Sequence, residues 1–96
     1  MRLSNFEKEA IIKTAKKYFN DFELYLFGSR IDDNKKGGDI DLYFKLQKKP
    51  EIMQKVKFLV ELKNLIGEQK IDVVIYYPQK KLREIDLIAQ KGIKLC

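Results

Sequence analysis

Residues 26–44 read LFGSRIDDNKKGGDIDLYF. The second half of this stretch alternates apolar with polar side chains, which predicts a β-strand that rests one face on the core. The apolar face carries Ile40, Leu42, Phe44 and Leu46, and the other face carries Asp39, Asp41, Tyr43 and Lys45. Because Asp39 and Asp41 are two positions apart, both carboxylates are expected to project from the same face.

Helices and strands alternate upstream of this stretch. Ser4 followed by Glu7 is the pattern of a helical capping box, and the helical spacing of apolar residues continues from there to Asn20. The aromatic and aliphatic run ELYLF at residues 23–27 predicts a strand that ends at Gly28.

The same alternation continues downstream. Pro50 is predicted to start a helix that ends at Gly67. A strand at residues 71–77, a last helix at 81–91 and a short extended segment at 93–95 then follow. Strands that alternate with helices predict an α/β or α+β sheet domain.

The composition narrows the chemistry that the chain can perform. It has no histidine and one cysteine, Cys96, which excludes zinc sites built from Cys and His, histidine-dependent triads and imidazole base catalysis. A metal would have to be held by oxygen, which favours Mg²⁺ or Mn²⁺. The net charge of +6 favours phosphates, nucleic acid or an acidic partner surface, although lysine pairs near turns are often simply solvated.

The sequence gives no sign of a membrane segment. No apolar run approaches the roughly 18 residues of a membrane span, and the start MRLSNFEKEA lacks the apolar stretch of a signal peptide. We therefore expect a cytoplasmic protein without a membrane partner.

Three acidic residues suggest a site for divalent cations. Two carboxylates side by side on a strand repel each other unless a cation lies between them, so the spacing of Asp39 and Asp41 suggests a metal site. Asp72 is an acid within the apolar strand IDVVIYY, where a buried carboxylate would cost several kcal/mol without a partner. Alternatively, the first two acids are the solvated start of a strand, and Asp72 forms a salt bridge to Lys70 or another lysine.

The turn after the first predicted strand suggests a phosphate site. Gly28 and Ser29 follow the strand, and a short helix could start at Arg30, so that backbone N–H groups would converge where a phosphate could lie. Glycine allows close approach, and the serine hydroxyl and the guanidinium add hydrogen-bond donors. Gly-Ser-Arg alone is a common tripeptide and usually only a turn. Together with three acids, however, it meets the needs of two-metal phosphoryl or nucleotidyl transfer.

In this order the motifs resemble those of the DNA polymerase β-like nucleotidyltransferase superfamily, and most closely its minimal nucleotidyltransferases, the prokaryotic antitoxins paired with HEPN-type toxins. The family signature is a strand, Gly-Ser, a loop of about ten residues, Asp-x-Asp and a later third Asp. Here it reads LFGSRIDDNKKGGDIDLYF followed by KIDVVIYY, and the resemblance extends over nearly the whole chain. It implies a nucleotidyltransferase core with a mixed β-sheet flanked by helices, in a single domain over residues 1–96.

The resemblance also implies a role for each motif residue. Nucleotide binding falls to Gly28, Ser29, Arg30 and Gly38, and catalysis and the binding of two Mg²⁺ ions, with Mn²⁺ as a substitute, fall to Asp39, Asp41 and Asp72. The sequence departs from the family pattern at two places. Gly38 stands where a serine is frequent, and Asp32 stands where a second basic residue is often found; Lys35 or Lys36 would then compensate.

The function implied by the resemblance is the transfer of AMP from ATP, or of another nucleotide from its triphosphate, to a hydroxyl on a HEPN-type toxin, by analogy a tyrosine. The chain would act as an antitoxin in a heteromeric complex. A non-catalytic module that neutralises the toxin by contact is an alternative, as is nucleotide transfer to a small molecule or to RNA. Nucleic acid is not the expected partner, because relatives with such acceptors generally carry additional domains.

Overall fold

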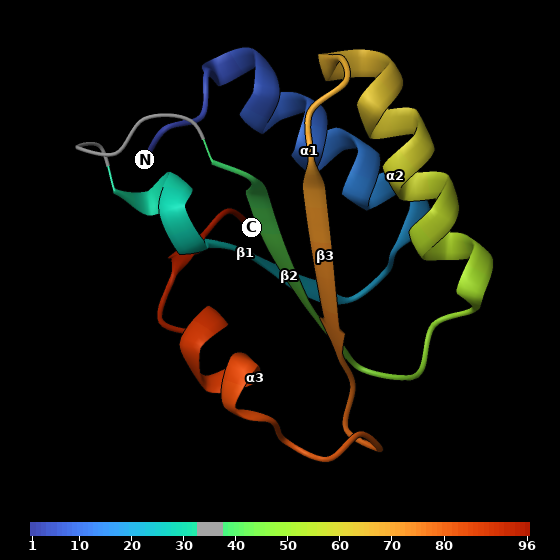
Figure 1. Ribbon diagram of the computed structural model, residues 1–96. Coiled ribbons are helices and arrows are strands. Elements are labelled where there is room, and N and C mark those ends of the chain that lie inside the picture. Colours follow the sequence, from blue (N-terminus) through green and yellow to red (C-terminus); the bar gives the residue numbers. More distant parts are fainter. Residues whose placement is uncertain (33–37) are drawn as a thin grey trace.

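The computed structural model describes residues 1–32 and 38–96 and forms a four-stranded sheet with helices on both faces (Figure 1). The elements in chain order are α1 (Asn5–Tyr18), β1 (Phe22–Phe27), the 3₁₀ helix η1 (Gly28–Ile31), β2 (Ile40–Leu46), α2 (Ile52–Ile66), β3 (Ile71–Tyr76), α3 (Glu84–Ala89) and β4 (Ile93–Lys94). The predicted α+β class is confirmed. None of the helices among the described residues combines the length and apolar character needed to cross a membrane.

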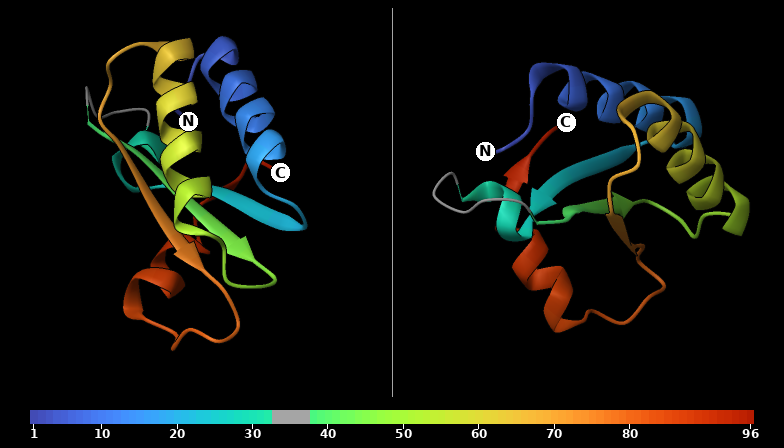
Figure 2. Two further views of the ribbon diagram at one scale, coloured as in Figure 1. Left: turned by 90° about the vertical axis from the view of Figure 1, so that its right-hand side faces the viewer. Right: turned by 45° about the horizontal axis from the view of Figure 1, so that its top comes forward.

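The sheet is mixed, with the strand order β3-β2-β1-β4. β1 pairs antiparallel with β2 and with β4, whereas β2 and β3 are parallel. A parallel pair requires a long crossover connection, and α2 provides it. α1 and α2 cover one face of the sheet, and α3 lies on the other (Figure 2).

The larger core lies between the sheet and the two long helices. On β2, Ile40, Leu42 and Phe44 are fully buried there, as the alternation predicted. The ring of Phe44 lies 4.5 Å from that of Phe19 and 5.1 Å from that of Phe58, centroid to centroid, which joins β2 to the C-terminal end of α1 and to the middle of α2. This packing fixes which face of β2 is turned inward and therefore which face carries the acids.

The start of α1 is also as predicted. Glu7 donates its backbone N–H to the Ser4 hydroxyl at 3.0 Å, and Ser4 donates its own N–H to the Glu7 carboxylate at 3.0 Å. The helix ends at Tyr18, two residues before the predicted end at Asn20, and Phe19 turns back into the core in an extended conformation.

The predicted last helix at residues 81–91 is too long, because α3 spans only Glu84–Ala89. Arg83 is still extended, and the Asp86 carboxylate accepts its backbone N–H at 2.6 Å, which fixes the start of the helix. At the other end, a side chain on Gly92 would clash with the carbonyl of Leu26. The end of the helix is therefore pressed against β1.

α3 is held to the sheet by a buried polar group. The Asp86 carboxylate is fully buried and also accepts two hydrogen bonds from the Arg83 guanidinium, at 3.0 and 3.2 Å. Burial alone would raise the pKa of Asp86, but these hydrogen bonds, with one from Tyr43, outweigh it and hold the pKa below its ordinary value. Tyr43 is fully buried beneath the helix, where desolvation raises its pKa to about 12.

We expect Asp86→Asn to destabilise the fold by about 2 kcal/mol near neutral pH, because it removes a charged acceptor from a buried network. The folded-state pKa is lowered, so this contribution is present above the unfolded pKa of about 4 and is lost as the pH falls through the folded value. Urea unfolding of wild type and Asp86→Asn over a pH series measures it. A difference between the two proteins that stays constant into the acid range would contradict the prediction, and Asp21→Asn, at an exposed acid, is the control.

Candidate metal and nucleotide site

The register between β2 and β3 brings the three predicted acids together. Asp41 pairs directly with Asp72 across the parallel strands, and Asp39 lies just before β2. One carboxylate oxygen from each residue can be chosen so that all three lie within 4.8 Å of one another. The cluster lies at the end of the sheet where η1 begins.

Asp72 is not buried, contrary to the prediction from its apolar surroundings. Its neighbours Ile71 and Val73 are 6% and 7% exposed and face the larger core, whereas Asp72 points to the opposite face and is exposed. Strand alternation therefore separates the carboxylate from the apolar side chains beside it in the sequence. The burial argument fails for Asp72, but its proximity to the other two acids is observed.

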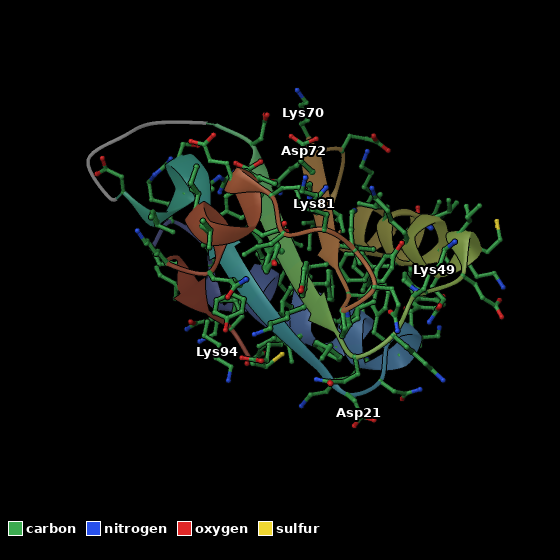
Figure 3. The ribbon with its side chains drawn as sticks, turned by 90° about the horizontal axis from the view of Figure 1, so that it is seen from below. Asp21, Lys49, Lys70, Asp72, Lys81 and Lys94 are labelled. Atoms are coloured by element: carbon green, nitrogen blue, oxygen red, sulfur yellow. The ribbon has the colours of Figure 1, made fainter. Side chains whose placement is uncertain are left out.

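The carboxylates in this cluster repel one another. The pKa of Asp41 is raised first by its partial burial and then by the charges of Asp72 and Asp39, while Lys70 lowers it. Lys70 places its ammonium 3.4 Å from the Asp39 carboxylate, but its side chain is 71% exposed. Lys70 and Asp72 lie at the same end of the sheet, opposite Asp21 (Figure 3). The expected alternative, a salt bridge from Lys70, thus involves Asp39 rather than Asp72.

The donor set fits a hard divalent cation. All three side chains offer carboxylate oxygens, which Mg²⁺ and Mn²⁺ prefer, and their mutual repulsion would be relieved by a cation between them. Lys70, which contacts the Asp39 carboxylate and whose side chain is largely in solvent, offsets only part of the negative charge.

The turn after β1 lies directly against the acids. Gly28 has a φ of 78°, and a Cβ at this position would clash with the Asp41 carboxylate. Gly38 has a φ of 91°, and a Cβ there would clash with the Ser29 hydroxyl. Both glycines are needed for left-handed backbone and for close packing. The predicted phosphate turn and the predicted metal ligands are therefore in contact.

Arg30 has contacts that the sequence did not predict. Its guanidinium donates to the backbone oxygens of Arg2 at 2.8 Å and Gly38 at 3.3 Å, and to the side-chain oxygen of Gln69 at 3.2 Å. Arg30 thus connects the segment before the acids to the N-terminus and to the segment before β3. It lies within η1, which starts two residues earlier than the predicted helix. Its role in nucleotide binding stays a prediction.

Two further residues support the turn and were missed by the sequence analysis. Arg2 donates to the backbone oxygens of Ser29 and Asp32, each at 2.8 Å. Gln69 accepts from Arg30 and donates to Glu7 at 2.8 Å. No local pattern could have revealed these contacts, because each joins residues at least 27 positions apart. Lys35 and Lys36, expected to compensate for Asp32, lie outside the described residues.

Comparison with protein families identifies the chain. The family described as Polymerase beta, Nucleotidyltransferase matches residues 9–96, which include both strands of acids and the turn. The chain belongs to this family. It therefore carries a nucleotidyltransferase domain whose substrate class is nucleoside triphosphates, and the resemblance seen in the sequence is confirmed at this level. Among curated proteins no match is found. Pairing with a HEPN toxin stays a prediction.

We expect Asp41→Asn to have opposite effects with and without metal. In a chelator the variant should melt at a higher temperature than wild type, because it removes repulsion within the cluster. With added Mn²⁺ wild type should be stabilised, and the variant should bind the ion about tenfold or more weakly, because a ligand charge is lost. Thermal melting and calorimetric titration measure both effects. Equal stabilisation of the two proteins by Mn²⁺ would be evidence against a metal site.

Gly28→Ala tests the contact between the turn and the acids. The added methyl group should cost about 1–2 kcal/mol of backbone strain and should also displace the Asp41 carboxylate. Gly67→Ala is a matched control, since Gly67 has a φ of 93° and a Cβ there would meet nothing within 4 Å. Both variants should lose stability, but only Gly28→Ala should weaken Mn²⁺ binding. Equal metal affinity in the two variants would argue that the contact has no role in the site.

Proposed function

We propose that this protein is a magnesium-dependent nucleotidyltransferase that transfers AMP from ATP to a hydroxyl on a partner protein. The observation that supports it best is the meeting of three carboxylates from β2, β3 and the residue before β2 within 4.8 Å, beside the glycine turn after β1. Membership of the nucleotidyltransferase family supports the reaction class.

The three acids would hold the metal ions together. Asp39 and Asp41 would hold two Mg²⁺ ions, or Mn²⁺ in their place, and Asp72 would complete the ligands on the acceptor side. When bound, the ions would polarise the acceptor hydroxyl and neutralise the triphosphate charge. Gly28 and Ser29 would hold the phosphates, since glycine at position 28 lets the turn lie directly against Asp41 and the Ser29 hydroxyl can donate.

The transfer would follow from this placement. The acceptor oxygen bonds to the α-phosphorus, and the bond from that phosphorus to the oxygen bridging to the β-phosphate breaks. Pyrophosphate leaves with the bonding electrons. The hydroxyl proton passes to Asp72, which is exposed and can release it to water. Because the sequence has no histidine, a carboxylate is the natural proton acceptor.

The proposed partner is a HEPN-type toxin, with a tyrosine as acceptor and loss of toxicity as the result. This part rests on the resemblance of the motifs to the minimal nucleotidyltransferases. With such a partner, the protein would act in the cytoplasm, within a heteromeric complex. The retention of all three acids favours catalysis over neutralisation by contact alone, because a module that only binds has no need for a repulsive cluster.

Radiolabelled ATP tests the reaction. With purified HEPN-type toxin and Mg²⁺, label from the α-phosphate should appear on the toxin, whereas label from the γ-phosphate should not. Asp41→Asn should reduce transfer by about 100-fold or more. Asp21→Asn, the same change at an exposed acid at the opposite end of the sheet, should leave it unchanged.

Transfer of γ-label would instead indicate a kinase, and no transfer to a folded toxin would count against the proposal. Neutralisation in cells decides between catalysis and contact. If Asp39→Asn with Asp41→Asn protects cells as well as wild type, the non-catalytic alternative is correct.

A further inference from the structure

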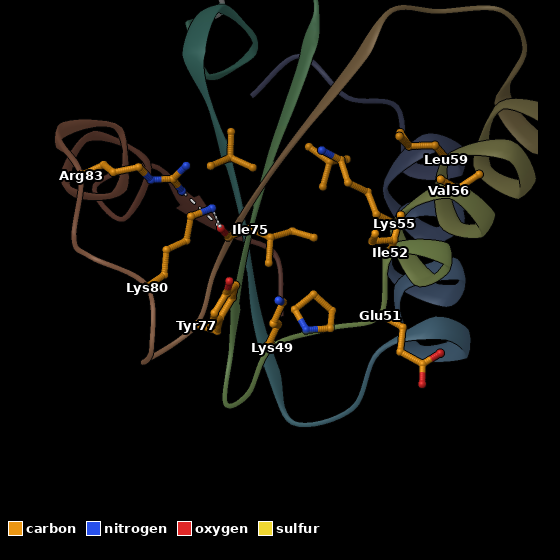
Figure 4. Close-up of a pocket in the computed structure, with 13 residues that line it drawn as sticks. Lys49, Glu51, Ile52, Lys55, Val56, Leu59, Ile75, Tyr77, Lys80 and Arg83 are labelled. Carbon is orange, nitrogen blue, oxygen red and sulfur yellow. Dashed lines mark hydrogen bonds between the residues drawn. The ribbon is translucent and has the colours of Figure 1, made fainter.

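A groove runs along the outer edge of the sheet, from the acids to the start of α2. One part of it, of about 540 Å³, lies between α2 and β3 (Figure 4). A second hollow reaches Asp41 and Asp72 and shares four lining residues with the first, namely Lys55, Leu59, Val73 and Val74. The two hollows therefore form one continuous groove, which we call the β3 groove.

The backbone of β3 is open along this groove. β3 is the last strand in the sheet order and pairs with β2 on its inner side only. Ile40 donates its backbone N–H to the backbone oxygen of Lys70 at 3.0 Å, so the backbone groups at position 70 face β2. In a parallel ladder every second residue of β3 faces β2 in this way. Ile71, Val73 and Ile75 must then direct their N–H and C=O groups outward. Among the described residues no other strand pairs with this edge.

The far end of the edge is already occupied. Lys80 and Arg83 both donate to the Ile75 carbonyl, at 3.1 and 3.2 Å (Figure 4). These contacts confirm that Ile75 faces outward. They also limit strand pairing to the part of β3 next to the acids, from Ile71 to Val73.

The lining suits a polypeptide with acidic side chains. Its walls are largely apolar, and on α2 Ile52 is 84% exposed and Val56 is 43% exposed beside the groove. In the part between α2 and β3, four lining residues are basic and one is acidic: Lys49, Lys55, Lys80 and Arg83 against Glu51. At the other end Asp41 and Asp72 line the groove, so the basic side chains gather away from the acids. Arg83 is paired with Asp86, which leaves three lysines to attract negative charge.

The groove reaches the three acids on the side of Asp72, where the acceptor hydroxyl is expected to enter. In the strand order, β3 and the turn after β1 lie on opposite sides of β2. If the triphosphate lies at Gly28, which contacts Asp41, the side of Asp72 remains open to an incoming hydroxyl. A residue paired with the edge of β3 would have its side chain about 5 Å from that of its partner on the same face.

We propose that the β3 groove binds an extended segment of the partner protein, which places acidic side chains near the lysines between α2 and β3, adds as a strand to Ile71–Val73 and presents its hydroxyl beside Asp72. The role of this segment as acceptor rests on the proposed function, whereas its binding does not. Backbone pairing supplies affinity, and the three lysines select acidic sequences. An RNA strand would also attract the lysines, but it could not pair with a β-edge and would meet apolar walls.

Nuclear magnetic resonance with the ¹⁵N-labelled protein tests this binding without nucleotide or metal. The probe is a short capped peptide of glutamates and valines around one tyrosine. It should shift the amide signals of Ile71 and Val73 and slow hydrogen exchange at Val73. The same peptide with lysine for glutamate, or with methylated backbone nitrogens, should bind at least about tenfold more weakly.

Lys→Glu variants test whether the lysines of the groove attract the peptide. Lys49→Glu with Lys55→Glu should weaken peptide binding about tenfold at physiological salt. Lys48→Glu with Lys57→Glu makes the same charge change on exposed neighbours in the same two segments and should have little effect. Both double variants should bind ATP with Mn²⁺ as wild type does.

Several results would overturn the proposal. These are peptide shifts away from β3, equal binding of the lysine peptide, tighter binding of an RNA oligonucleotide in the groove, or self-association that Lys49→Glu with Lys55→Glu abolishes. Failure of wild type to bind ATP with Mn²⁺ would contradict the proposed function but not the peptide site. Peptide binding without transfer of AMP to its tyrosine would remove only the acceptor role.

Discussion

The parallel pairing of β2 with β3 is the constraint on which the site depends. It sets Asp41 opposite Asp72, and a slip by one residue would turn one carboxylate into the core. The register is held by apolar burial on the far face, where Ile40, Ile71 and Val73 pack beneath the two long helices. The positions of the acids are thus set by apolar core residues that take no part in the reaction. The stability of the larger core offsets the repulsion within the cluster.

Much of the fold was accessible from the sequence because its signals are local. The capping box at Ser4, the alternation in β2 and the turn at Gly28 each depend on neighbours within a few positions. The acids could be assigned as a group for the same reason, since a two-residue spacing fixes a common face. The exposure of Asp72 follows from the same rule, but the apolar composition of its strand obscured it. The excess length predicted for the last helix arose because helical spacing continues beyond the point where Arg83 is held extended.

The remaining features depend on tertiary contacts that no local pattern reports. The Arg30 guanidinium donates hydrogen bonds to Arg2, Gly38 and Gln69. The residue expected to bind phosphate therefore also holds the turn in place. The second face of β2 was predicted as the acidic face, yet Tyr43 on it is fully buried under α3. α3 therefore covers the middle of this face, around Tyr43, and leaves the end that carries the acids uncovered. The proposed chemistry lies at this uncovered end of the sheet, and the proposed access of the partner lies along the open edge of β3.

The capped carbonyl of Ile75 has a consequence for the protein at high concentration. An unpaired strand edge can template the stacking of further copies and lead to aggregation, and longer free edges are more hazardous. Here Lys80 and Arg83 close one end, so the free edge extends only from Ile71 to Val73. The molecule can thus keep a docking edge open while resisting fibre formation with itself.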